Sequence, residues 1–167
     1  MNTQTPVFAG TTAECLRHFA TASGITIQNR NKFGLRQELC AVLGLESATF
    51  HRWCTGRTLP AGIRLIKLQK LLVLAGYDIN DRVPTPELVR ELVDLVALTV
   101  LSLEQIAEAI DSSPRLVVCW ATGEITSFSR SNRAAIDQLV SGKSGDVRKQ
   151  TRKVLDVLRK LDLEISL

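Results

Sequence analysis

The sequence is poor in aromatic residues and histidine, and its cysteines are not grouped. Only 5% of its 167 residues are aromatic whereas 45% are apolar, so we expect a core of aliphatic side chains. The four cysteines show no Cys-x-x-Cys spacing, and only two histidines could join them as metal ligands. We therefore expect buried free thiols and no metal site.

Long apolar runs are missing too. Even Leu92–Leu103 is interrupted by Asp94, and it is shorter than the roughly 20 residues that a membrane-spanning helix needs. Met1–Gly10 lacks the basic and then apolar layout of a signal peptide. The expectation is a soluble, cytoplasmic protein that does not bind a membrane.

The residue sets typical of enzymes are also absent from the sequence. It shows no Ser/His/Asp or Cys/His set, no paired-carboxylate motif and no Gly-rich loop. Ser141–Gly145 (SGKSG) is similar to the end of a phosphate-binding loop, but Asp137 stands where that loop needs its first glycine, and no strand precedes it. We predict neither an enzyme nor a cofactor, and we interpret Ser141–Gly145 as a flexible joint.

The net charge of +4 is unevenly distributed along the chain. Residues 1–83 contain ten Lys/Arg and five Asp/Glu, residues 84–140 four and eight, and residues 141–167 seven and four. A basic region is thus followed by an acidic one and then by a basic tail. Only the basic parts are suited to a polyanionic partner.

The leucine-rich sequence has few alternating, strand-like runs, and Gly34–Gly56 predicts two short helices with a tight corner between them. Gly44 supplies the left-handed conformation that ends the first helix. The apolar residues spaced to face one another across the corner are Leu39, Leu43, Phe50 and Trp53. The residues left outward on the second helix are Ser47, Ala48, Thr49, His51 and Arg52. Such small, hydrogen-bonding and basic side chains suit a helix that lies in a major groove.

The same stretch resembles the Cro and lambda-repressor (XRE-type) family of helix-turn-helix domains. The residues that carry the resemblance are Leu39-Cys40, Gly44-Leu45, Phe50, Trp53 and Gly56. Cys40 replaces the family's alanine, and Leu35 stands where the family usually has a capping serine or threonine. The resemblance implies binding to double-stranded DNA through Arg36, Gln37, Ser47, Ala48, Thr49, His51, Arg52, Thr55 and Arg57. In that arrangement Arg36 and Gln37 contact phosphate or brace the recognition helix, and Arg52 reads a guanine.

The rest of the first domain is expected to be helical. Thr11 and Thr12 can cap a helix that ends near Gly24, and a polar connection follows from Ile25 to Phe33. After the corner, a helix over about 61–75 has three basic residues, Arg64, Lys67 and Lys70. They form either a solvated face or a phosphate contact. Asn80–Pro86 (NDRVPTP) ends the domain, with Thr85 as the cap of the next helix.

A second, divergent copy of the corner occupies Leu101–Gly123. Its Trp and Gly residues both follow those of the first copy by 67 positions. Ser102 and Gln105 form a capping box, and Asp111 replaces the turn glycine. Its outward residues are Ser113, Pro114, Arg115, Val118 and Cys119. Because this face is mostly apolar and its segment is acidic, we expect it to bind a protein or to be covered by the chain, and not to read DNA.

The C-terminal helix, which begins after Asp146, has a heptad seam with charged residues outside it. Its members are Val147, Thr151, Val154, Leu158, Leu161 and Ile165. The seam predicts a homodimer. The alternative is a last helix that packs on its own domain.

The sequence therefore predicts an all-α protein with two tandem lambda-repressor-like helix-turn-helix domains and a C-terminal helix. The domains are residues 1–83, 84–141 and 142–167. The expected function is that of a sequence-specific DNA-binding regulator, most simply a homodimeric repressor. The alternative is an adaptor or assembly subunit that binds a protein partner, or binds nucleic acid without sequence preference.

Overall fold

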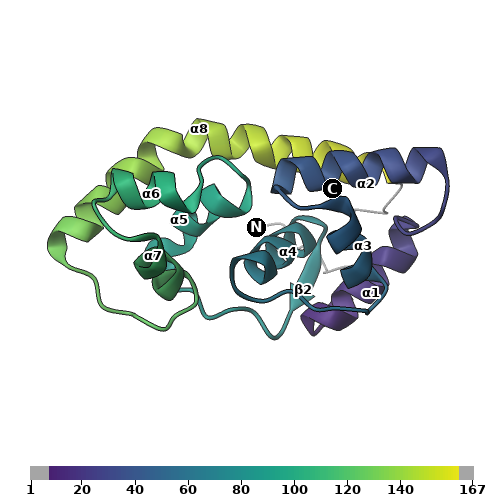
Figure 1. Ribbon diagram of the computed structural model, residues 1–167, viewed down its shortest axis with the longest axis horizontal. Coiled ribbons are helices and arrows are strands. Elements are labelled where there is room, and N and C mark those ends of the chain that lie inside the picture. The colour runs from purple at the N-terminus through teal and green to yellow at the C-terminus, as the bar shows by residue number, and fades with distance from the viewer. Residues whose placement is uncertain (1–7, 162–167) are drawn as a thin grey trace, which may run out of the picture.

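The computed structural model describes residues 8–161, which are mostly helical, as expected, with one pair of short strands. Helices α1–α4 form one half of the molecule and α5–α7 the other, and α8 spans both (Figure 1). The elements are β1 (Phe8–Gly10), α1 (Thr12–Ser23), α2 (Arg30–Leu43), α3 (Ser47–Cys54), α4 (Gly62–Leu74), β2 (Tyr77–Ile79), α5 (Glu87–Ala97), α6 (Leu103–Ala109), α7 (Pro114–Ala121) and α8 (Arg130–Lys160).

The two strands are absent from the sequence-based expectation. β1 and β2 pair in parallel, with Phe8 opposite Tyr77, and they bring the two ends of the first half together. Each strand has only three residues, which is too short to show an alternating pattern.

The ends of α1 and α2 are set by capping side chains. Thr11 and Glu14 form a capping box at the start of α1, and Gly24 ends that helix with a φ of 62°. The predicted polar connection of residues 25–33 is too long, because α2 begins at Arg30. Asn29 caps this helix by accepting a hydrogen bond from the Lys32 backbone N–H at 2.8 Å. Leu35 thus lies inside α2, and the helix needs no cap at that position.

Of the helix-end features predicted in the second half, two are present and one is not. The capping box of Ser102 and Gln105 is present, and Asp111 has the expected left-handed backbone, with a φ of 51°. Thr85, however, does not cap α5. Its hydroxyl donates a 2.6 Å hydrogen bond to the carbonyl oxygen of Ala121, so it ties the segment before α5 to the end of α7.

The interpretation of Ser141–Gly145 as a flexible joint is wrong. These residues lie within α8, a continuous helix of 31 residues, and the predicted boundary between residues 141 and 142 falls inside it. Tertiary contacts hold the helix on both sides of the two glycines. Ile136 belongs to the core of the second half, whereas Val154 and Leu158 belong to the core of the first. Packing of this kind outweighs the low helix propensity of glycine.

The seam predicted for self-association is packed within the chain. Val154, Leu158 and Leu161 are almost completely buried in the core that also contains residues of α1–α4. Val147 and Thr151 are half-buried, and Ile165 lies outside the described residues. The seam is therefore not available for a dimer interface. The alternative, a last helix that packs on its own domain, is not met either, because the helix covers the first domain.

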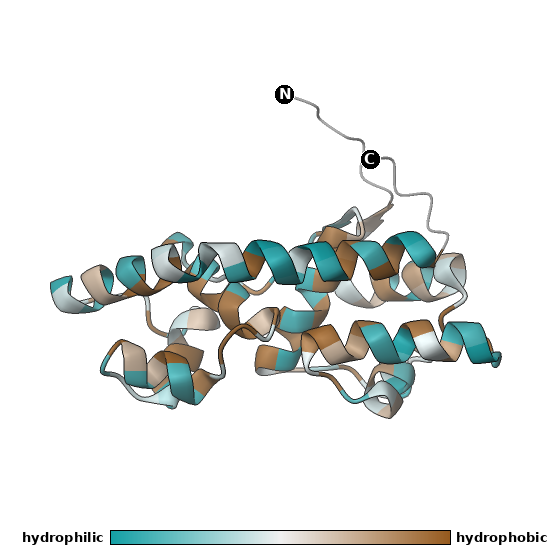
Figure 2. Ribbon diagram, turned by 90° about the horizontal axis from the view of Figure 1, so that it is seen from above, coloured by the Kyte–Doolittle hydropathy of each residue, from teal (hydrophilic) through white to brown (hydrophobic). Residues whose placement is uncertain are grey.

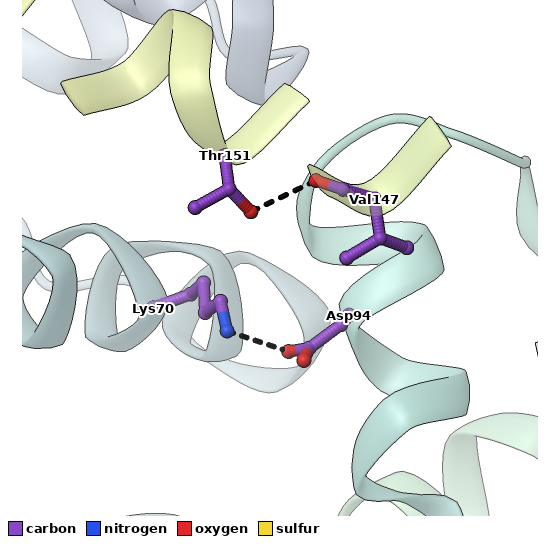
Figure 3. Close-up of polar contacts among 4 residues, drawn as sticks. All are labelled: Lys70, Asp94, Val147 and Thr151. Carbon is purple, nitrogen blue, oxygen red and sulfur yellow. Dashed lines mark hydrogen bonds and ion pairs between the residues drawn. The ribbon is translucent and has the colours of Figure 1, made fainter. Parts of the chain in front are cut away.

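Direct contacts join the two halves. Lys70 of α4 forms an ion pair with Asp94 of α5, with a distance of 3.1 Å (Figure 3), beneath the part of α8 that contains Val147 and Thr151. Thr99 has a φ of 58°, which is unfavourable for a β-branched residue, and its hydroxyl donates a 2.8 Å hydrogen bond to the Val42 carbonyl oxygen at the end of α2. The connection between α5 and α6 is thus attached to α2, the helix that precedes α3.

Candidate nucleic-acid interface

The corner between α2 and α3 has the backbone geometry that the sequence predicts. Gly44 ends α2 with a φ of 61°, and the backbone N–H of Leu45 closes the turn on the carbonyl oxygen of Cys40 at 2.9 Å. The residues that fill the corner are all buried: Leu39, Leu43, Phe50 and Trp53. The rings of Phe50 and Trp53 meet edge to face, with centroids 6.4 Å apart. Aliphatic and aromatic packing thus fixes the angle of α3.

The outward side of α3 is polar and only partly ordered by contacts within the helix. Ala48 and Arg52 are exposed, whereas Ser47, Thr49 and His51 are half-buried. The predicted residues outside α3 are exposed as well, except for Arg36, which is half-buried: Gln37 on α2, and Thr55 and Arg57 after α3. A ligand that approaches α3 from solvent thus meets five exposed side chains and, between them, the partly accessible Ser47, Thr49 and His51.

Arg36 braces α3 from the neighbouring helix. Its Nε donates to Ser47 Oγ at 2.9 Å, and its Nη1 lies 2.8 Å from Nδ1 of His51. The guanidinium group also lies over the ring of Phe33, 5.1 Å from its centroid. Arg36 therefore occupies the bracing role that the sequence left open as an alternative to phosphate contact. Phe33 was not identified as part of this arrangement, although its position three residues before Arg36 on the same helix face was a usable signal.

The contact with Arg36 also defines the protonation state of His51. Arginine has no acceptor, so His51 Nδ1 must accept this hydrogen bond, and the ring proton resides on Nε2. Burial lowers the pKa of His51 below its ordinary value, and the charges of Arg36 and Arg57 lower it further. His51 is thus a neutral ring that offers an N–H donor.

A chain of hydrogen bonds orders the side chains at the start of α3. Arg52 Nη2 donates to Thr49 Oγ1 at 3.2 Å, and this hydroxyl donates to Glu46 Oε2 at 3.3 Å. Arg52 keeps its remaining N–H donors, because guanidinium has five. Glu46 was not among the predicted site residues, although its position three residues before Thr49 indicates such a pair. The Thr55 hydroxyl instead donates to backbone carbonyl oxygens of His51 and Arg52, at 3.1 and 3.2 Å.

The basic stripe on α4 is largely used within the protein. Lys67 Nζ donates to the Leu43 carbonyl oxygen at 2.9 Å, which stabilises the end of α2, and burial together with the nearby Arg64 lowers the pKa of Lys67. Lys70 is paired with Asp94. Arg64 alone of the three is exposed, and it shares a groove with Gly44, Glu46 and Thr49 beside the start of α3. Of the stripe, only Arg64 suits a phosphate contact.

The corner contains two free thiols, Cys40 and Cys54. Burial raises the pKa of both Cys40 and Cys54 to about 12, so both remain protonated near neutral pH. Cys40 is the buried residue that replaces the family's alanine, and its small side chain packs between the helices. Cys40 is thus a buried free thiol, as expected, whereas Cys54 is free but only half-buried against the same core.

The second corner, between α6 and α7, has a similar backbone but a different surface. Asp111 and Gly123 have φ values of 51° and 77°, close to the 61° and 76° of Gly44 and Gly56 in the first corner. Counted 67 positions on, the counterparts of Arg36, Ser47, His51 and Arg52 are Leu103, Pro114, Val118 and Cys119. The whole polar brace is thus absent from α7, whose Cys119 thiol donates instead to Glu124 Oε2 at 3.3 Å.

Comparisons with known proteins give no relative. The chain matches no family model, and neither a curated protein nor a solved structure shows a significant match. No helix among residues 8–161 is long and apolar enough to cross a membrane.

Proposed function

We propose that the protein is a sequence-specific DNA-binding regulator that places α3 in a major groove. The observation that carries this proposal is the brace from Arg36 to Ser47 and His51. Side chains that are already held in place lose less conformational entropy when they bind, so a rigid polar helix face is suited to reading base edges. The exposed Arg52 on α3, Arg57 after it and Arg64 beside its start add positive charge to this region.

Each side chain of the site has a role that follows from its hydrogen-bonding capacity. Arg52 donates to a guanine with the N–H groups that Thr49 does not use. His51 offers its Nε2–H to a base acceptor, and Ser47, Ala48 and Thr49 meet the remaining base edges. Gln37, Thr55, Arg57 and Arg64 lie at the margins of the α3 face, where they contact the phosphate backbone.

A repressor is the simplest form of such a regulator, and the XRE-type resemblance favours a homodimer on an inverted repeat. Because the α8 seam is buried, the dimer would have to use another surface. Footprinting on the preferred DNA distinguishes a dimer from a monomer. Two half-sites about one helical turn apart, or a multiple of it, indicate a dimer, whereas a single asymmetric site indicates a monomer.

Selection of bound sequences from a random pool of duplex DNA tests the proposal. We expect enrichment of one short motif, and footprinting should locate the protein on it. If no motif is enriched, the protein does not read sequence.

A protein-interaction adaptor is the second candidate, and the surface of α7 favours it. Val118 and Cys119 occupy outward positions there, in the acidic half of the chain, where the first corner has His51 and Arg52. Such a face is better suited to a protein than to phosphate. A salt titration separates the two functions. Steep salt dependence without a preferred sequence indicates contact with the DNA backbone alone, as expected for an assembly subunit that binds nucleic acid without sequence preference.

A further inference from the structure

The long helix α8 carries the positive charge of the protein. It contains nine basic and three acidic residues, a net charge of +6 in a chain whose total is +4, so the rest of the chain is slightly negative. The region that contains α3, residues 1–83, is also basic, with ten Lys/Arg and five Asp/Glu, so the charge of α8 is additional to that beside the α3 face proposed above to bind DNA. The function proposed for α3 does not explain the charge of α8.

Four cations on two successive turns of α8 form what we term the α8 basic patch: Arg148, Lys149, Arg152 and Lys153. All four side chains are exposed, and none forms an ion pair with any residue in the part of the chain that the structure describes. Their spacing places like charges four residues apart twice, an arrangement that destabilises a helix. A bound polyanion removes this repulsion.

The cations further along α8 are arranged differently. Arg159 pairs with Asp156 at 3.2 Å on the same helix, and Lys160 pairs with Glu38 of α2 at 3.5 Å. Those cations are partly neutralised by neighbouring carboxylates. The α8 basic patch is therefore the unneutralised part of the C-terminal half of α8.

The α8 basic patch faces away from α3. On the opposite side of α8, Val154 and Leu158 are buried in the core of the first half. α2 packs against both α3 and α8, and Figure 1 shows α8 along the upper edge of the molecule with α3 beneath α2. Figure 2, seen from above, shows α8 beside α2 with hydrophilic residues along its C-terminal half. A straight duplex in contact with α3 cannot also lie along this patch.

The composition of the patch identifies its partner. The large exposed apolar residues among residues 8–161 are Ile27, Phe33 and Leu59, and none of them is on α8. An interfacial membrane helix needs an exposed apolar face, and the core of a protein interface needs apolar or aromatic anchors. The phosphate backbone of nucleic acid needs only cations.

We propose that the α8 basic patch binds the phosphate backbone of a second DNA duplex, without sequence preference, so that the protein bridges two DNA segments. The bridging rests on the function proposed for α3, whereas the backbone binding by α8 does not. A duplex on α3 and a duplex on α8 lie on opposite sides of the protein. The protein thus joins a specific site to neighbouring DNA.

Neutralisation of the patch tests the backbone contact. The variant Arg148→Gln/Lys149→Gln/Arg152→Gln/Lys153→Gln removes four charges but keeps good helix formers on an exposed face. The matched control, Arg17→Gln/Arg82→Gln/Arg90→Gln/Arg115→Gln, removes four exposed charges elsewhere. Affinity for a random-sequence duplex is measured against salt concentration, and circular dichroism verifies that each variant is folded. We expect the slope of log K against log salt to fall by about 0.9 per lost contact, hence by about 3.6, for the patch variant and by less than 1 for the control. Equal slopes for wild type and patch variant would overturn the proposal.

Bridging is measured with two duplexes. One carries the selected site and is fixed to beads, and the other is a labelled random sequence in solution. We expect wild type and control to retain the labelled duplex and the patch variant to lose it, with unchanged affinity for the fixed site. Retention by the patch variant would refute bridging. If selection yields no site, the function proposed for α3 fails, but the change in salt slope still decides the role of α8. Loss of binding to phosphatidylserine vesicles without a change in the duplex slope would assign the patch to a membrane and refute the DNA contact.

Discussion

Arg36 and His51 lie on different helices, yet Nη1 of the arginine is 2.8 Å from Nδ1 of the histidine. Because the guanidinium group can only donate, this contact exists only while His51 Nδ1 is unprotonated. One hydrogen bond thus couples the orientation of α3 to the ionisation of one of its own side chains. This hydrogen bond leads to two predictions, one for the pH dependence of stability and one for sequence reading by α3.

Stability should fall on acidification through the pKa of His51. Burial, Arg36 and Arg57 lower this pKa in the folded protein, so below about pH 6.5 the unfolded chain binds more protons than the folded one. The free energy of unfolding must therefore decrease as the pH falls from neutral through this range. Urea unfolding at pH 7.5 and 5.5 measures it. His51→Gln should show a smaller decrease between the two pH values, and an identical decrease would contradict the role of His51.

Replacement of Arg36 by lysine should weaken sequence reading without weakening attraction to DNA. Lysine keeps the positive charge but cannot donate in a fixed fork to Ser47 and His51 together. We expect a loss of about 1 kcal/mol on the preferred site, because a brace of hydrogen bonds is lost, and relaxed preference at the base pairs that Ser47 and His51 contact. The salt slope should not change. Selection with this variant and a salt titration provide both measurements, and a lower slope would mean that Arg36 itself contacts phosphate.

Loss of the Arg52 side chain should lower the affinity mainly for the preferred DNA. Arg52→Ala should cost about 1 to 3 kcal/mol there and relax the preference at one base pair. Arg115→Ala, at an exposed position of α7, is the control and should have little effect. Affinities for the preferred and a random duplex are compared at one salt concentration. Equal losses on both duplexes would show that Arg52 does not read a base.

Local signals in the sequence predicted most of the first corner. Gly44 and the spacing of Leu39, Leu43, Phe50 and Trp53 suffice for the helices and the turn, because backbone conformation and periodicity act over a few residues. The contacts of Arg36 with Ser47 and His51 were harder to predict from the sequence. The sequence left two roles open for Arg36, phosphate contact and bracing of α3. It could not decide between them, because the distance between side chains on different helices depends on how the helices pack.

The larger errors concern α8, where distant contacts decide the structure. Gly142 and Gly145 suggested a joint, and the heptad seam suggested a partner chain. Neither signal contains the information that Val154 and Leu158 pack on α1–α4 while Ile136 packs on α5–α7. A seam shows that a helix has an apolar side but not what covers it.

Because α8 is continuous through its two glycines, two substitutions at Gly142 should change the free energy of unfolding in opposite directions. A Cβ at Gly142 would meet no atom within 4 Å, so Gly142→Ala should stabilise the protein by about 1 kcal/mol, the difference in helix propensity. Gly142→Pro should destabilise it by about 3 kcal/mol, because proline removes a helical hydrogen bond and clashes with the preceding turn. Urea unfolding of both variants measures these changes. In a flexible joint, both substitutions would be nearly neutral, so that result would refute the continuous helix on which the placement of the α8 basic patch depends.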